Sequence, residues 1–186
     1  MIYRNTLLSI TLYFISFTLS AQDIWSPLES MKIKSISQTE ISNDGKSIAY
    51  VVREPIMEGK KSEYLSQIWV TDTESKENIQ YTFNQKSSSS PKFSPDGKKI
   101  AFLSSRSGKN QIWIMNTLGG EARMLTKEKK GVRSIKWSPD GKMISFLKSD
   151  DDTEDEIKSK ENKTDVILVD KNFKYSHIYS YHLDED

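Results

Sequence analysis

A ten-residue segment that occurs three times constrains the fold of this chain more than any other feature. Each copy holds an Asp-Gly-Lys sequence followed by a short apolar run, and the copies align without gaps. They are Ile41–Tyr50, Phe93–Phe102 and Trp137–Phe146. A second segment repeats downstream, as Gln67–Val70, as Gln111–Ile114 and, more weakly, as His177–Ser180. Repetition at a period of roughly 40 to 50 residues indicates an array of like supersecondary units.

The repeated turn predicts a β-hairpin. In Ser94-Pro95-Asp96-Gly97 the proline ring presets φ for the second position of a type I turn, and glycine accepts the left-handed conformation that closes a bulged hairpin. Ile100–Phe102 and Ile112–Met115 are apolar at successive positions. Because successive side chains of a strand point to opposite faces, both faces of these strands are expected to be buried. This is typical of a sheet that lies between two like sheets.

The spacing predicts an all-β chain, an incomplete β-propeller of about two and a half four-stranded antiparallel blades. The blades are expected at residues 37–83, 88–126 and 131–186, the last one incomplete, after a signal peptide at 1–21 and a lead-in at 22–36. The expected strands of the second blade are Pro91–Ser94, Lys99–Ser104, Gln111–Asn116 and Glu121–Leu125. Those of the third blade are Arg133–Ser138, Met143–Leu147 and His177–Leu183.

A charged insertion at about residues 149–164 interrupts the third blade. Its composition predicts a solvated, mobile loop. A calcium loop is the alternative, because Asp150, Asp152, Glu154 and Glu161 fall at the offsets of EF-hand ligands. Asp155 stands where such a loop needs glycine, and no flanking helices are evident, so the sequence favours the solvated loop.

The N-terminus is typical of a secretory signal. Arg4 is followed by an apolar run from Thr6 to Leu19 and by the small residues Ser20 and Ala21, and acidic residues begin only at Asp23. The run is shorter than the roughly 20 residues that span a bilayer. Export to a periplasm or to the medium is therefore predicted, with cleavage near Ala21/Gln22 and no membrane span in the mature chain. The alternatives are a retained anchor and a buried segment of the folded domain.

Composition excludes several kinds of chemistry. The chain contains no cysteine, which removes disulfides, thiol catalysis and cysteine metal sites. The formal net charge is +1, and no basic stripe with interleaved aromatic residues is present, so nucleic acid is not an expected partner. No cofactor site or metal site is predicted.

The Ser-Pro-Asp-Gly-Lys turn followed by Ile-Ala-Phe resembles the repeat of prolyl-oligopeptidase-family propellers, which TolB-like propellers share. The charged insertion leading into Asp165–Tyr179 is more similar to the acylaminoacyl-peptidase and dipeptidyl-peptidase branch of that family. The resemblance covers nearly all of the mature chain. It implies a propeller that covers an α/β-hydrolase domain with a Ser-Asp-His triad and restricts its substrates to peptides.

No catalytic residue is predicted within this chain. The nucleophile elbow Gly-x-Ser-x-Gly does not occur in the sequence. His177 and His182, the only histidines, are interpreted as strand-surface or structural residues, because a general base needs a positioned nucleophile. Trp69 and Trp113 occupy equivalent repeat positions and are expected to pack between blades rather than stack on a ligand. The remaining residues that could be taken for ligands are Asp44, Asp96 and Asp140, and their place in the turns explains them instead.

The sequence therefore predicts a non-catalytic propeller fragment of an exported serine peptidase, which gates peptide access to a hydrolase domain missing from this chain. Peptides are the expected substrates of the whole enzyme, and no peptidase activity is expected of the chain alone. One alternative is a TolB-like periplasmic propeller that acts as a protein-binding scaffold. Another is a half-propeller that completes itself by oligomerising.

Overall fold

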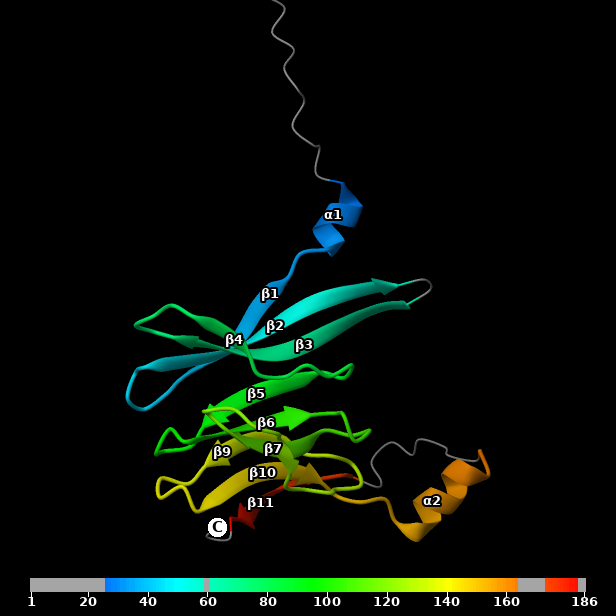
Figure 1. The fold of residues 1–186 in the computed structure, drawn as a ribbon. Coiled ribbons are helices and arrows are strands. Elements are labelled where there is room, and N and C mark those ends of the chain that lie inside the picture. The colour runs from blue at the N-terminus through cyan, green and yellow to red at the C-terminus, as the bar shows by residue number, and fades with distance from the viewer. Residues whose placement is uncertain (1–25, 59–60, 164–172, 184–186) are drawn as a thin grey trace, which may run out of the picture. The chain divides into compact units, whose positions relative to one another are not determined.

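The computed structural model describes residues 26–58, 61–163 and 173–183. The chain divides into two compact units, Met1–Met31 and Lys32–Asp186. In the first unit the described element is the short helix α1 (Pro27–Met31); the predicted signal peptide lies outside the described residues. The second unit holds three antiparallel sheets and a second helix, α2 (Figure 1). Among the described residues, no helix is long and apolar enough to cross a membrane.

The three sheets follow one another along the chain. The first is formed by β1 (Ser35–Ile41), β2 (Ser47–Glu58), β3 (Lys61–Asp72) and β4 (Asn78–Gln80). The middle sheet is formed by β5 (Ser88–Phe93), β6 (Lys99–Ser104), β7 (Gln111–Asn116) and β8 (Arg123–Met124). The third is formed by β9 (Arg133–Trp137), β10 (Met143–Ser149) and β11 (Ser176–His182). All seven strands predicted for residues 88–183 are confirmed.

The turns form as predicted from the repeat. In the middle sheet the Gly97 N–H donates to Ser94 O at 2.9 Å, and Gly97 has a φ of +71°. Gly45 and Gly141 close the corresponding turns of the other two sheets with the same φ. A residue with a Cβ rarely adopts this conformation, so glycine is required there. The turn sets the register in which Phe93 pairs with Ile100.

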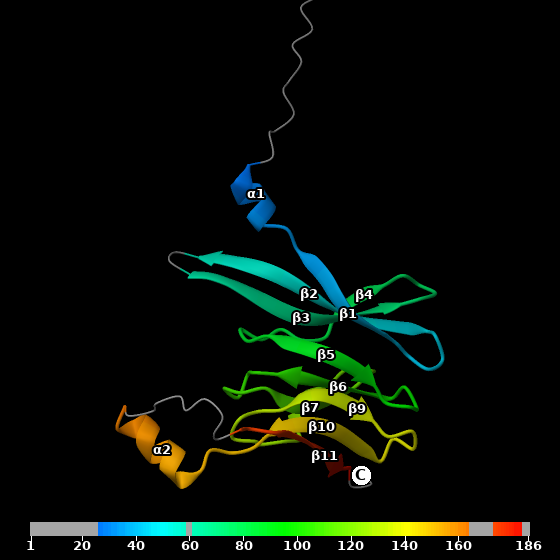
Figure 2. The same ribbon diagram turned by 180° about the vertical axis from the view of Figure 1, so that it is seen from behind.

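The sheets are stacked face to face, with the middle sheet between the other two (Figures 1 and 2). One apolar cluster joins the first and middle sheets, and a second joins the middle and third. Ile100 and Phe102 of β6 lie in the first cluster, whereas Ala101 and Leu103 lie in the second. Burial of both faces of the middle sheet is thus confirmed.

The two clusters are built from the same repeat positions. The first sheet supplies Ala49, Val51, Ile68, Val70 and Tyr81, and the middle sheet supplies at the same positions Ala101, Leu103, Ile112, Ile114 and Leu125. Facing them are Phe93, Ile100, Phe102 and Met115 in the first cluster and Trp137, Ile144, Phe146 and Tyr181 in the second. Each sheet is therefore packed on the next by the same side-chain pattern.

The prediction of a loop throughout the charged insertion is wrong for Glu154–Glu161, which form helix α2. Thr153 caps this helix: its hydroxyl accepts from the Glu156 N–H, and the Glu156 carboxylate accepts from the Thr153 N–H, a reciprocal capping box. No residue of α2 is buried, so the helix is held by its cap and by charged contacts rather than by an apolar face.

Candidate functional site

The strands β1, β5 and β9 lie next to one another at one edge of the stacked sheets and share an unusual backbone feature. Each pairs with its neighbour through a register shift. At equivalent positions Gln38, Ser90 and Ser134 have φ values of +53°, +53° and +55°. Non-glycine residues rarely adopt this region, and its recurrence marks a β-bulge built into every repeat.

Polar side chains along this edge connect one sheet to the next. Gln38 Oε1 accepts from the Ser90 N–H at 2.7 Å. Lys92 Nζ forms an ion pair with Glu40 Oε2, and Trp137 Nε1 donates to Lys92 O at 3.0 Å. Lys92 thus contacts both neighbouring sheets through different atoms. Lys136 stands at the corresponding position of β9, and its side chain is exposed.

A cavity of about 490 Å³ opens along the same edge. Its lining combines one carboxylate from the first sheet with two ammonium groups and apolar side chains from the middle and third sheets. The side chains that reach it include Glu40, Lys92, Ile135, Lys136, Trp137 and Pro139. A mixed lining of this kind suits an extended peptide, which presents both amide groups and apolar side chains.

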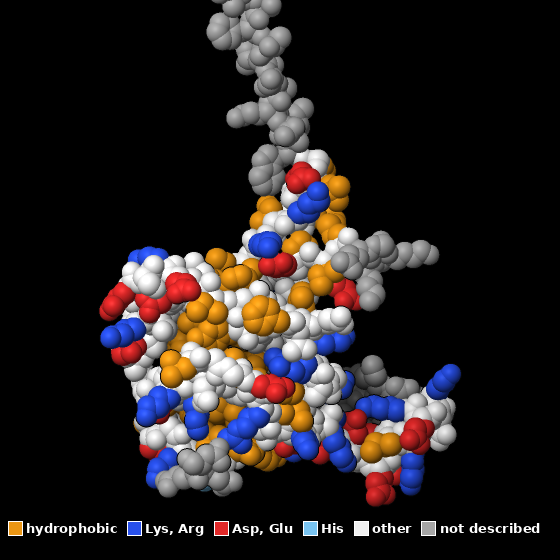
Figure 3. Space-filling view, viewed as in Figure 1, with side chains coloured by type: hydrophobic (Ala, Val, Ile, Leu, Met, Phe, Trp, Pro, Cys, Tyr) orange, Lys and Arg blue, Asp and Glu red, His pale blue; other side chains and the backbone are white. Residues whose placement is uncertain are grey.

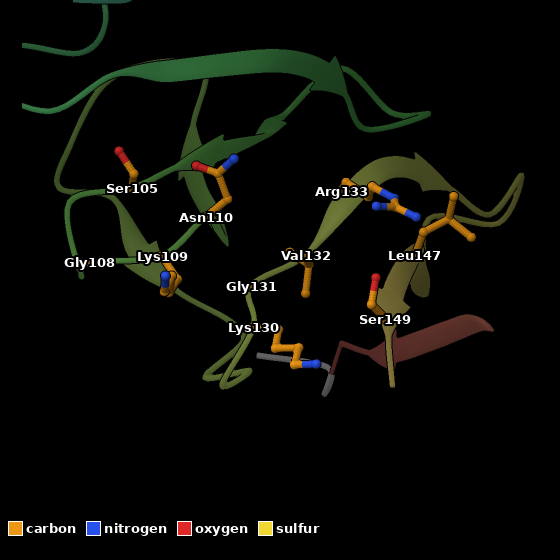
Figure 4. Close-up of a pocket in the computed structure, with 10 residues that line it drawn as sticks. All are labelled: Ser105, Gly108, Lys109, Asn110, Lys130, Gly131, Val132, Arg133, Leu147 and Ser149. Carbon is orange, nitrogen blue, oxygen red and sulfur yellow. The ribbon is translucent and has the colours of Figure 1, made fainter. Parts of the chain in front are cut away.

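A second cavity, of about 400 Å³, lies at the β6–β7 turn (Figure 4). Lys109 and Asn110 come from that turn, Lys130 and Arg133 from the chain around the start of β9, and Ser149 from the end of β10. One of its three positively charged side chains, Lys130, is paired with a carboxylate. Lys130 Nζ lies 2.6 Å from Asp152 Oδ1, and Arg133 donates to Ser176 Oγ. Its lining holds no acidic residue and no histidine, so it offers no acid–base pair.

The turn aspartates Asp44, Asp96 and Asp140 are explained by turn chemistry, as predicted. Each carboxylate accepts from the hydroxyl of the serine two residues earlier and from the backbone N–H two residues later. The serine hydroxyl contributes most to holding the pKa of each carboxyl below its usual range, followed by the backbone N–H. These oxygens are engaged in the turns.

A second repeated polar motif was missed from the sequence. Gln111 Oε1 accepts from Thr126 Oγ1 at 2.8 Å, and Thr126 Oγ1 in turn accepts from the Ile112 N–H at 3.0 Å. Gln67 and Thr82 form the same pair in the first sheet, and all four residues are buried. In both copies the threonine follows the glutamine by fifteen residues, which is the signal that could have revealed the pair. The motif fixes the chain where it leaves each four-stranded sheet.

The two tryptophans differ in their surroundings. Trp113 packs against the first cluster, as predicted, with the Arg106 guanidinium 4.5 Å from its ring centre. Trp69 points to the other face of the first sheet, as strand alternation places it opposite Ile68 and Val70, and it is only partly buried. Packing between sheets is confirmed for Trp113 alone.

The histidines lie on β11, both exposed. His177 Nε2 is 3.1 Å from Asp150 Oδ1. Within the described residues neither histidine is hydrogen bonded to a serine, so no nucleophile–base pair is assembled around them.

The acidic residues of the insertion are joined to lysines. Asp152 contacts both Lys130 and Lys160, which lowers its pKa to about 2, and Lys174 likewise lowers the pKa of Glu156. Glu154 and Glu161 are placed on α2, where a calcium-binding loop would have to run. The EF-hand alternative therefore does not fit this segment.

Comparison with known proteins identifies the repeat. The family described as the Tricorn protease N-terminal beta propeller domain matches residues 53–164, more than half of the chain. The chain belongs to this propeller family. The resemblance to peptidase propellers proposed from the turns is thereby confirmed.

Peptidases are among the similar proteins. The uncharacterized peptidase YuxL of Bacillus subtilis is 36% identical over 76 residues, 41% of this chain and 11% of YuxL. An acylaminoacyl peptidase in complex with a chloromethyl ketone is 26% identical, with a TM-score of 0.58 over 70% of this chain and 20% of that one. Uncomplexed Pyrococcus horikoshii acylaminoacyl peptidase shares the fold at 21% identity, with a TM-score of 0.62 over 82% of this chain and 23% of that one. The chain thus spans between a tenth and a quarter of these relatives.

Proposed function

We propose that the three sheets are propeller blades, the third incomplete, and that they form the substrate-admitting part of an exported serine peptidase. The observation that carries the proposal is the equivalence of the two inter-sheet clusters, which is how blades of a propeller pack. The similarity to an acylaminoacyl peptidase and to YuxL supports hydrolysis of peptide bonds as the reaction class of the whole enzyme. The hydrolase domain belongs to a part of that enzyme other than this chain.

In this proposal the propeller admits extended peptides along the edge formed by β1, β5 and β9. The cavity there is lined by Lys92, Lys136 and Glu40 beside Trp137, so charged ends and apolar side chains of a peptide both find partners. A folded protein is too large for a cavity of about 490 Å³. Peptide selection would therefore occur before any bond is broken.

Peptide binding tests the proposal through the fluorescence of Trp137. Short acylated peptides titrated into the chain are expected to change the tryptophan emission, and Trp137→Phe is expected to remove the change. Trp113→Phe serves as the matched control, because Trp113 lies outside this cavity. A TolB-like scaffold is favoured instead if short peptides leave the emission unchanged while a folded protein partner binds.

Activity is tested separately. The purified chain is expected to leave an aminoacyl-nitroanilide substrate intact, because it lacks the nucleophile elbow. Cleavage that a serine-directed inhibitor abolishes would overturn this expectation.

Export also remains part of the proposal. The N-terminal sequence of the chain recovered from the cell envelope is expected to begin at Gln22. Recovery from the cytoplasm with Met1–Ala21 intact would contradict it.

A further inference from the structure

Lysine side chains gather where the chain leaves the middle sheet, on the connection from β8 to β9. Lys127 and Lys129 of this connection are exposed, and together with Lys109 of the β6–β7 turn they line a cavity of about 270 Å³. Glu128 also lines it, but its carboxylate is paired with Lys148 Nζ at 2.7 Å. In the part of the chain that the structure describes, none of the three cavity lysines contacts a carboxylate. The lysine cavity, lined by these three side chains, therefore carries uncompensated positive charge.

A buried glutamine fixes the backbone that carries two of these lysines. Gln111 Nε2 donates to Glu128 O at 2.8 Å, and Gln111 Oε1 accepts from the Glu128 N–H at 3.0 Å. The Val132 N–H donates to Asn110 O at 2.8 Å, which joins the same connection to the β6–β7 turn. A ligand of the lysine cavity thus meets a backbone that is already held in place, so less conformational entropy is lost when it binds.

The first sheet shows that the fold of the repeat does not require these lysines. Gln67 Nε2 donates to Asn84 O, so the connection that leaves the first sheet is held by the same contact. At the positions of the three cavity lysines the first sheet has Leu65, Phe83 and Gln85, none of which is charged. Like charges that are held close together repel one another and disfavour the folded state. A shared anion would remove this repulsion in the middle sheet.

The next lysine along the chain indicates which anion fits. Lys130 Nζ lies 2.6 Å from Asp152 Oδ1, so a carboxylate of the charged insertion already binds to this connection. Three separate ammonium groups suit a segment with several carboxylates, because each ammonium is a compact point charge. Met124 lines the same cavity and offers apolar surface to the methylene groups of such side chains.

Positive charge continues beyond the lysine cavity. Lys109 also lines the cavity of about 400 Å³ at the β6–β7 turn, together with Lys130 and Arg133 (Figure 4). Figure 3 shows that Lys and Arg side chains gather over the middle and third sheets on the face it presents, whereas hydrophobic side chains are prominent over the first sheet. An acidic segment that extends out of the lysine cavity would therefore meet further positive charge.

We propose that the lysine cavity binds an acidic peptide segment, whose glutamate or aspartate carboxylates pair with Lys109, Lys127 and Lys129. Positive charge at this end of the middle sheet would also raise the rate at which acidic peptides reach it. This inference goes beyond the proposed peptide-admitting role and does not depend on it, because the cavity along β1, β5 and β9 shares no lining residue with the lysine cavity.

Fluorescence anisotropy of a labelled peptide that carries three glutamates among uncharged residues tests the proposal. The unmodified chain is expected to bind this peptide and to leave the same peptide with glutamines in place of the glutamates unbound. Each of Lys109→Gln, Lys127→Gln and Lys129→Gln is expected to raise the Kd by about two- to fivefold, because a single exposed ion pair contributes little. The triple variant is expected to raise the Kd by about tenfold or more.

Lys86→Gln is the matched control, because it removes the same charge from an exposed residue on the equivalent connection of the first sheet. It should bind the glutamate peptide like the unmodified chain. Circular dichroism should show that the triple variant keeps its strand content, and the triple variant should leave the response of Trp137 to acylated peptides unchanged. Absence of binding to the unmodified chain, or equal binding by the triple variant, would overturn the proposal. So would an equal loss in Lys86→Gln, or binding of a phosphoserine peptide in place of the glutamate peptide.

Discussion

The middle and third sheets carry the same repeat, yet their surroundings differ. Among the described residues the middle sheet has a neighbouring sheet on both faces, whereas the third sheet has one on a single face. Phe102 of the middle sheet is fully buried, and its counterpart Phe146 stacks on Tyr179, which is 41% exposed. Gln111 is buried, and its counterpart His177 is exposed. Equivalent positions of the repeat thus have the same local structure but contribute differently to the stability of the chain, because the number of neighbouring sheets decides how much each position contributes.

The largest expected effect compares the two phenylalanines. Phe102→Ala should lower the free energy of unfolding by about 3 to 5 kcal/mol, because it leaves a cavity between two packed sheets. The loss of unfolding free energy in Phe146→Ala should be smaller than in Phe102→Ala, by at least about 1 kcal/mol. The reason is that the Tyr179 ring lies at the surface and can close part of the space. Urea unfolding followed by circular dichroism measures both. Equal losses would show that the third sheet is as constrained as the middle one.

The glutamine motif gives an intermediate effect. Gln111→Ala should lower the free energy of unfolding by about 1 to 3 kcal/mol, because Thr126 Oγ1 and the Glu128 N–H lose a buried acceptor. His177→Ala, at the equivalent exposed position, should change it by less than about 0.5 kcal/mol. Gln111→Leu combined with Thr126→Val leaves the N–H groups of Ile112 and Glu128 without their acceptors and should be at least as destabilising as Gln111→Ala. A double variant that is more stable than Gln111→Ala would show that these hydrogen bonds are not the cause.

The smallest effect concerns the insertion that only the third sheet carries. The pKa of Asp152 is about 2 in the folded chain, first through Lys130 and then through Lys160, and 3.8 without these contacts. A carboxyl with a lowered folded pKa stabilises the fold above its unfolded pKa, and this contribution is lost as the pH falls from about 4 to about 2. The Tm of Asp152→Asn should therefore lie slightly below that of the unmodified chain at pH 6 and approach it near pH 2. A Tm difference that stays constant over this range would contradict the assignment.

The fold was predictable where local sequence decides it. Each Ser-(Pro/Asn)-Asp-Gly turn fixes its own hairpin through contacts within six residues, such as Ser94 with Lys99, so the strands around it were predicted to within a few residues. Burial of both faces of β6 followed from three consecutive apolar residues. The position of the bulges was not predictable, because Gln38, Ser90 and Ser134 adopt a left-handed conformation that none of them favours.

Helix α2 and the Gln–Thr pairs were missed for different reasons. Helix α2 has no apolar face, so hydrophobic periodicity carries no signal, although Thr153 and Glu156 form a readable capping box. Gln111 and Thr126 are separated by a strand and a turn, so only their recurrence in the first sheet connects them. The ion pair between Lys92 and Glu40, at the edge formed by β1, β5 and β9, depends on a contact between repeats, which a single copy of the repeat does not reveal.

The duplication of one apolar cluster has a consequence for how the chain loses its structure. Because each cluster joins only adjacent sheets, disruption spreads from neighbour to neighbour, as in a short row of coupled units. Strand β11 packs on the second cluster only, through Tyr181, so we expect it to detach while the first cluster stays intact and its amide protons to exchange with solvent by local opening. Strand β6 contributes to both clusters, so we expect its amide protons to exchange only when both clusters are disrupted.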